Sequence, residues 1–295
     1  MATSNWTTAA QHDSDANFRI WGSELSTKLQ AMSSTPGLVK TGDTGQINWT
    51  TVTRPAVNSD AGYEIYYLND SLHATSPVYF KIWYGSASNV AYPRIRIQVG
   101  TGSDGAGTLT GTTSTASICN KSAATSATTY TSYLCVNTGF VGLAWKVAAT
   151  FVGSFLICRS CDADGTPNGK AIFIGTRSTS TSNFAGQTVR LESVAAAQTQ
   201  DATARCSLIP GGKTSSAVGA DFEVYLCWMN APDIRPIFGA GCVIVDDYPL
   251  GTTISVALVG TTARTYLSTG AGSSAPFPIP DAGGVTTSGL AMLWE

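Results

Sequence analysis

The sequence predicts a mainly β protein, with an antiparallel β-sandwich or jelly-roll-like body and one N-terminal amphipathic helix. Three observations support this prediction. Charged residues make up 12% of the 295 residues, about half the usual share, and long exposed helices need such residues on their wet face. Ser and Thr are abundant instead, and Thr is favoured in strands. Apolar and polar residues alternate in several segments, whereas helical periodicity occurs in one.

Residues 1–33 are expected to form an N-terminal arm and a helix. The first 14 residues are polar and without periodicity, which indicates an arm. In "DANFRIWGSELSTKLQAM", 15–32, apolar residues recur at spacings of three and four, so they form one stripe along a helix. Asp15 is the expected N-cap, and "SSTPG" ends the helix. The stripe is a candidate assembly contact that either plugs one end of the β body or docks on a neighbour; it consists of Phe18, Trp21, Leu25, Leu29 and Met32.

Residues 34–295 are expected to form the β-rich body. Apolar and polar side chains alternate in "YFKIWYG" and "RIRIQV", within 62–100, which predicts antiparallel, half-buried strands. Gly, Asp, Asn and Pro between 37 and 61 indicate turns, and "TGSDGAGTLTG", 101–111, predicts a glycine-rich turn. The Ser-, Thr- and Ala-rich segment 112–138 is expected to be a surface excursion, and it is the candidate place for a subdivision of the body.

The apolar segment 139–158, "GFVGLAWKVAATFVGSFLIC", is long enough to resemble a membrane span. Lys146 lies within it, together with two glycines, whereas a span needs about 20 apolar residues with few or no charges. We therefore expect two buried strands around Lys146 and no membrane insertion. The first 18 residues lack the basic and apolar regions of a secretory signal, so no such signal is expected.

The charge balance argues against nucleic acid as a partner. The net charge is −2, from 17 basic and 19 acidic residues, and no run of Lys or Arg occurs. Binding to phosphate backbones needs a basic surface. A surface with few charges has little electrostatic protection against association, which favours contacts with copies of the same chain.

The seven cysteines are expected to be mostly buried, reduced thiols. Several lie in apolar, strand-like runs, where Cys packs as a small hydrophobe. Cys158 and Cys161, in "CRSC", are the candidate intersubunit or redox thiols. Structural zinc usually needs four ligands, and the two histidines, His12 and His73, lie far off in sequence. Zinc shared between subunits and a local disulfide remain minor alternatives, and no metal or other cofactor is expected.

Three further motifs indicate turns rather than ligand sites. "GTGSDG", 100–105, has the spacing of a dinucleotide loop, but no helix follows it. "PGGKTSS", 210–216, has Ser207 where a phosphate loop needs its first Gly. "CDADGTPNG", 161–169, is followed by Ala171, where a calcium loop needs Glu.

No catalytic set emerges, so an enzyme is not expected. A Ser–His or Cys–His pair needs a well-placed base, and neither histidine lies near a nucleophile motif. The carboxylates that suit a glycosidase pair are Asp246 or Asp247 with Asp233 or Glu223. Three tryptophans suit either a sugar-stacking surface or a strand core: Trp49, Trp83 and Trp228.

The chain resembles a group of virion structural proteins of tailed bacteriophages. The segments that carry the resemblance are "FRIWGSELSTKLQAM", "GLVKTGDTGQINWTTVTRPAVNSDAGYEIYYLNDSLHATSPVYFKIWYG" and "VGTGSDGAGTLTG". It is strongest over residues 17–111 and returns in "RPIFGAGCVIVDDYPLGTT" and "GLAMLWE", whereas 112–200 matches only in general character. The resemblance implies a structural role in the particle and supplies no catalytic residues.

From this resemblance we expect a homo-oligomer that is made in the host cytoplasm and located in the virion. Its expected partners are copies of itself, other virion proteins of the tail or capsid, and host surface glycan. The location expected first is the tail, tail tip or fibre region, since aromatic-rich β loops there would touch host glycan. The alternatives are a capsid decoration (cement) protein and a free carbohydrate-binding or hydrolytic β-protein.

Overall fold

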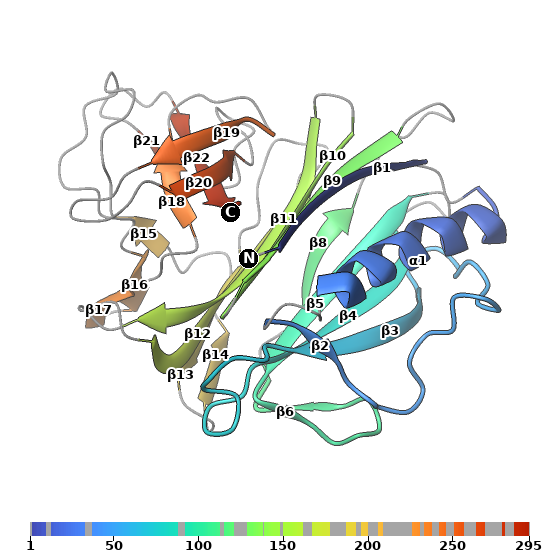
Figure 1. Cartoon of the computed structure of the whole chain (residues 1–295), viewed down its shortest axis with the longest axis horizontal. Helices are drawn as coiled ribbons and strands as arrows, with labels where there is room; N and C mark the ends of the chain where they lie inside the picture. The colour runs from blue at the N-terminus through green and yellow to red at the C-terminus, as the bar shows by residue number, and fades with distance from the viewer. Residues whose placement is uncertain are drawn as a thin grey trace.

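The computed structural model describes residues 2–9, 13–32, 37–87, 92–112, 115–120, 129–137, 139–147, 150–161, 167–177, 187–192, 196–199, 206–208, 226–230, 233–237, 242–245, 251–256, 264–268, 279–280 and 286–294. Within these ranges the chain is mainly β: the helix α1 is accompanied by strands that pair antiparallel in several sheets (Figure 1). The expected fold class, mainly β with one N-terminal helix, is confirmed at this level.

Two sheets hold most of the core. The large sheet has seven strands in the order β1 (Ala2–Ala9), β9 (Thr129–Asn137), β10 (Phe140–Val147), β11 (Thr150–Cys161), β12 (Pro167–Arg177), β13 (Gln187–Glu192) and β14 (Ala196–Thr199). The N-terminal sheet has five strands in the order β2 (Val39–Lys40), β3 (Asp60–Tyr67), β4 (Tyr79–Ser86), β5 (Pro93–Gly100) and β8 (Ala116–Asn120).

Smaller sheets complete the described strands. The hairpin of β6 (Gly102–Ser103) and β7 (Leu109–Thr110) occupies the segment expected to be a glycine-rich turn. A three-stranded sheet consists of β15 (Cys206–Leu208), β16 (Leu226–Asn230) and β17 (Asp233–Ile237). The C-terminal sheet has the order β18 (Cys242–Val245), β22 (Thr286–Leu293), β20 (Arg264–Ser268) and β19 (Thr253–Val256), and β21 (Ile279–Pro280) also pairs with β22.

The helix α1 (Asp15–Ala31) forms where the apolar stripe predicts it, but its N-cap lies one residue earlier than expected. The Ser14 side chain accepts a hydrogen bond from the backbone N–H of Asn17, 3.2 Å away, which satisfies one of the donors left open at a helix start. Asp15 is instead in the first turn, where a negative charge suits the helix dipole. Its carboxylate accepts a hydrogen bond from the backbone N–H of Arg54 at 2.8 Å.

The expected N-terminal arm forms the strand β1. It pairs antiparallel with β9 over its whole length, from Ala2 opposite Val136 to Ala9 opposite Thr129. The sequence TSNWTT shows no alternation of apolar and polar residues, because Ser and Thr occupy both faces of the strand. Its Trp6, however, packs against the core. Thr and Trp are favoured in strands, and this preference is the signal that periodicity alone misses.

Part of the expected surface excursion at 112–138 also lies in a sheet. Its end forms β9, between β1 and β10 in the large sheet, where Leu134, Cys135 and Val136 are fully buried. The interpretation as an excursion is therefore wrong for 129–137, and also for 116–120, which form β8 of the N-terminal sheet. The Ser- and Thr-rich composition of the whole segment masked the short apolar run "YLCV".

The apolar segment around Lys146 forms two paired strands, as expected. β10 and β11 run antiparallel on either side of residues 148–149, with a change of register after Trp145. The side chains of Val141, Leu143, Phe155 and Ile157 are buried. No helix in the described part of the chain is both long and apolar enough to cross a membrane.

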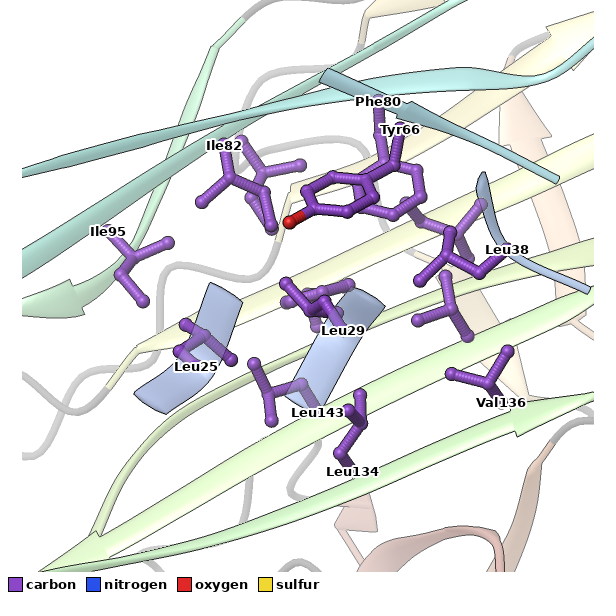
Figure 2. Close-up of a cluster of buried hydrophobic side chains, with 14 of the residues drawn as sticks. Leu25, Leu29, Leu38, Tyr66, Phe80, Ile82, Ile95, Leu134, Val136 and Leu143 are labelled. Atoms are coloured by element: carbon purple, nitrogen blue, oxygen red, sulfur yellow. The ribbon is translucent and has the colours of Figure 1, made fainter. Parts of the chain in front are cut away.

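The core of the described residues joins α1, the N-terminal sheet and the large sheet in one apolar cluster. Figure 2 shows Leu25 and Leu29 of α1 between Tyr66, Phe80 and Ile82 on one side and Leu134, Val136 and Leu143 on the other. The helix packs closely at Gly22, because a Cβ atom there would lie 1.8 Å from the Trp49 ring. The N-terminal helix is thus a layer of the core.

Candidate functional site

The strongest candidate site lies on the outer face of the N-terminal sheet. Alternation along β4 turns Phe80, Ile82 and Tyr84 into the core and leaves Lys81 and Trp83 on the opposite face. In the sheet register Trp83 is opposite Tyr63 of β3 and Arg96 of β5. This pairing gathers cations and aromatic rings that are far apart in sequence.

Two guanidinium groups share one carboxylate at this site. Oδ1 of Asp60 accepts a hydrogen bond from Arg94 Nη2 at 2.7 Å, and its Oδ2 accepts one from Arg96 Nη2. Nε of each arginine is buried and has no hydrogen-bond acceptor. The three side chains together carry a formal net charge of +1.

The aromatic rings of this face contact cations. The Lys81 ammonium lies 3.7 Å from the centre of the Tyr63 ring and 4.6 Å from that of Trp83. The guanidinium of Arg96 lies 5.1 Å from the Trp83 ring centre, and all three separations are within the range of cation–π attraction. Burial lowers the pKa of Lys81, since desolvation disfavours the charged ammonium.

An open pocket of about 450 Å³ occurs on this face. We call it the Trp83 pocket; it is lined by Asn58, Ser59, Asp60, Ala61, Gly62, Trp83, Arg94 and Arg96. Asn58 has a left-handed backbone with φ 56°, a conformation that Asn tolerates in turns. Gly85 lets this turn lie close to β4, since a Cβ atom there would be 2.4 Å from the Ser59 carbonyl oxygen.

A folded loop next to the pocket fixes Lys81. The ammonium donates a hydrogen bond to the Gly107 carbonyl at 2.5 Å, and the backbone N–H of Gly107 donates one to the Asp43 carboxylate at 3.1 Å. Burial alone would raise the pKa of Asp43, but hydrogen bonds from Ser103, Thr41 and Gly107 outweigh burial and lower it. The segment that includes "GTGSDG" therefore serves as a structural turn.

Two buried charge clusters support the core rather than line a pocket. Glu64 is fully buried and accepts hydrogen bonds from Ser26, Lys40, Tyr66 and Tyr84. The sequence did not single out Glu64, because its neighbours in "GYEIYYL" gave no sign that a carboxylate points inward.

The second cluster joins β11 to the segment that follows β3. Arg159 donates two hydrogen bonds to Asp70, from Nε at 2.7 Å and from Nη2 at 2.9 Å, and a third to the Ser76 carbonyl at 2.6 Å. Both side chains of the ion pair are 4% exposed. Arg159 was equally unforeseen, since it lies between the two cysteines of "CRSC".

The five residues of the helix stripe are all buried in the core of their own chain. Phe18 and Leu29 are 0% exposed, and the remaining exposed fractions are at most 6%, that of Met32. A contact with another subunit would therefore use the opposite side of α1, where Ile20 is 49% exposed. A role of the helix in assembly stays a prediction.

The other described candidate residues lie outside the lining of the Trp83 pocket. Trp49 packs against Phe18 and Tyr84, with ring centres 5.7 and 4.8 Å apart, and His73 stacks on Tyr67. Asp233 begins β17, and Trp228 is in β16. Outside the described residues are His12, Glu223, Asp246 and Asp247. Across the described residues, no three His, Cys, Asp or Glu side chains are grouped to hold a metal ion.

The candidate thiols lie in one strand. Cys158 is 3% exposed and lies opposite Phe140 of β10, and Cys161 ends β11 opposite Pro167. An intersubunit bridge through Cys158 would require this strand to open. Cys135 of β9 is also buried, and burial raises the pKa of its thiol to about 12, which keeps it protonated at neutral pH.

Cys135 and Cys158 are expected to resist iodoacetamide in the native protein at mildly alkaline pH and to react fully in urea, because alkylation needs an accessible thiolate. Mass-spectrometric peptide mapping measures this and separates Cys158 from Cys161, since trypsin cleaves after Arg159 between them. Rapid labelling of either buried thiol in the folded protein would contradict its burial.

The chain matches no family model, no curated protein and no solved structure.

Proposed function

We propose that this chain is a non-enzymatic structural component of a tailed-phage virion. One observation supports the proposal: the part of the chain that most resembles virion proteins, residues 17–111, holds most of α1 and the strands β2 to β7. The helix α1 packs on the inner face of β3 and β4 through the Ser26–Glu64 hydrogen bond and the Trp21–Tyr84 contact. A helix and a sheet in direct contact are a feature that related structural proteins would share.

The proposed placement is the tail, its tip or the fibre region, where the protein would act as a homo-oligomer in contact with other virion proteins. The body would be an antiparallel β-sandwich or jelly-roll-like structure, with the N-terminal sheet and the large sheet as its two layers. The shared apolar cluster between these sheets supports this proposal. A capsid decoration protein is the alternative placement.

Quantitative mass spectrometry of purified particles tests both the role and the placement. The chain should be present in particles freed from host debris, in few copies per virion for a tail component. Hundreds of copies would favour capsid decoration, because decorations follow the icosahedral lattice. Absence from the particle would refute the structural role.

The Trp83 pocket favours a second candidate function, carbohydrate binding. Its volume lies within the about 300–1,000 Å³ that small-molecule sites usually have, and its mainly polar lining, with one tryptophan, suits a hydroxyl-rich ligand. The two functions are compatible in one chain, since a tail protein with such a pocket would contact host surface glycan.

A further inference from the structure

The unequal number of charges in the Trp83 pocket indicates the charge of its ligand. Arg94 and Arg96 together carry two positive charges, and Asp60 supplies one negative charge. Lys81 also lies beside Trp83, but it is outside the pocket lining and its charge faces the carboxylates of Asp104 and Asp43, so the excess within the lining is +1. A ligand with one negative group would balance this excess, and it would find guanidinium donors that match carboxylate or phosphate geometry.

The size of the pocket indicates that the ligand is larger than a simple ion. Its volume is about 450 Å³, whereas one water molecule occupies about 30 Å³ in the liquid. Apart from Trp83 and Ala61, the lining offers mainly amide, hydroxyl, carboxylate and guanidinium groups. These groups suit a molecule rich in hydroxyls, with one apolar edge against the half-buried indole.

We propose that the Trp83 pocket binds an acidic sugar unit, a sugar ring that carries a carboxylate or a phosphate. The acidic group lies against the guanidinium groups of Arg94 and Arg96, whose side chains are 13% and 33% exposed, and the hydroxyls reach Asp60, Ser59 and Asn58. Because the pocket is open, the sugar extends outward as an end or branch of a longer glycan. A nucleic acid offers phosphates too, but the net charge of −2 and the lack of a basic run argue against it.

This inference gives chemical detail to the proposed glycan contact, but its test needs only the purified chain. Isothermal titration calorimetry compares D-glucuronate, glucose 6-phosphate, D-glucose and a single-stranded oligothymidylate. At least one acidic sugar should bind about tenfold more tightly than glucose, since hydrogen bonds to a charged group are stronger than those between neutral groups. Which acidic sugar binds better tells whether the natural group is a carboxylate or a phosphate. Binding should weaken as salt is added.

Substitutions of Arg96 test whether the sugar binds in the Trp83 pocket. Arg96→Gln should reduce affinity for the acidic sugar about tenfold or more, while the Arg94–Asp60 pair keeps the turn in place. Arg96→Lys keeps the charge but loses the planar donor pair, so it should fall between wild type and Arg96→Gln. Lys28→Gln removes one positive charge from α1 and serves as the control.

Circular dichroism of each variant should match that of the wild type. The proposal is overturned if neither acidic sugar binds, if glucose binds equally well, if Arg96→Gln binds unchanged, or if the oligonucleotide binds more tightly than both sugars. None of these outcomes bears on the presence of the chain in the virion, so failure here is distinct from failure of the structural role.

Discussion

Deletion of residues 1–32 is expected to prevent the chain from folding. The deletion removes the edge strand β1 and the helix α1, including Phe18, Trp21, Leu25, Leu29 and Met32, which are all buried in the core. Each such side chain stabilises the fold by about 1.5–3 kcal/mol through burial. The set contributes about 8–15 kcal/mol, which is as large as the whole stability of a typical domain.

Two single substitutions on α1, one at a buried and one at an exposed position, measure how much the buried stripe contributes to stability. Leu29→Ala creates a cavity between the two main sheets and should cost about 2–5 kcal/mol, whereas Ile20→Ala, at a position 49% exposed, should stay within about 0.5 kcal/mol. Urea unfolding followed by tryptophan fluorescence measures both. A truncated chain that shows native dispersion in NMR spectra would contradict the proposed role of the helix in the core.

Failure to fold and failure to assemble need separate tests. Loss of the truncated chain from particles would reflect its failure to fold, so it would not identify a docking helix. The variant Ile20→Asp changes the exposed side of α1 and leaves the buried stripe intact. If this variant folds normally and still enters particles, the exposed side of the helix makes no essential contact.

The sequence predicted the elements whose pattern is local. The 3.6-residue stripe located α1, and alternation located β4 and β5 together with their inner and outer faces. It missed β1, whose Ser and Thr residues obscure its alternation, and also β8 and β9, which lie in the Ser- and Thr-rich segment 112–138. For β1 and β9, pairing across the large sheet decides the structure, and these two strands are more than a hundred residues apart.

The candidate site was predictable only in part. Trp83 was noticed as an aromatic that suits either sugar stacking or a core. The cations around Trp83 depend on the register of three strands, and Asp60 reaches the arginines from the start of β3, more than thirty residues earlier. Pairing between strands that are far apart in sequence gives no periodic pattern, so the pocket can be recognised only once the strands are paired.

Glu64→Ala is expected to destabilise the protein by about 3–5 kcal/mol, the usual cost of removing one partner from a buried ion pair. Oε1 of Glu64 accepts hydrogen bonds from Ser26 of α1 and from Lys40, both at 2.6 Å. Its Oε2 accepts one from Tyr84 at 2.6 Å and one from Tyr66 at 3.0 Å. The carboxylate therefore ties the helix to three strands, and its loss leaves buried donors without an acceptor.

The two tyrosines that donate to Glu64 should make the stability of the protein depend on pH in the alkaline range. Burial first, and then the negative charge of Glu64, raises the pKa of Tyr66 and of Tyr84 well above 10. The unfolded chain ionises these phenols near pH 10, so the native state holds more protons above that pH. Their contribution to stability is complete below pH 10 and is lost as pH rises above it.

The size of the Glu64 effect follows from comparing variants by urea unfolding. Glu64→Gln keeps the shape and one acceptor oxygen but turns an amide N–H₂ toward other donors, so it should cost about 1–3 kcal/mol. Glu24→Gln changes a half-buried carboxylate of α1 that has one oxygen without a hydrogen bond, and it should shift stability by at most about 0.5 kcal/mol. Lys40 is 24% exposed in its side chain and can regain water, so the buried hydroxyls of Ser26 and the tyrosines account for most of the loss. Equal midpoints for Glu64→Ala and Glu24→Gln would show that the carboxylate does not anchor the helix to the sheet.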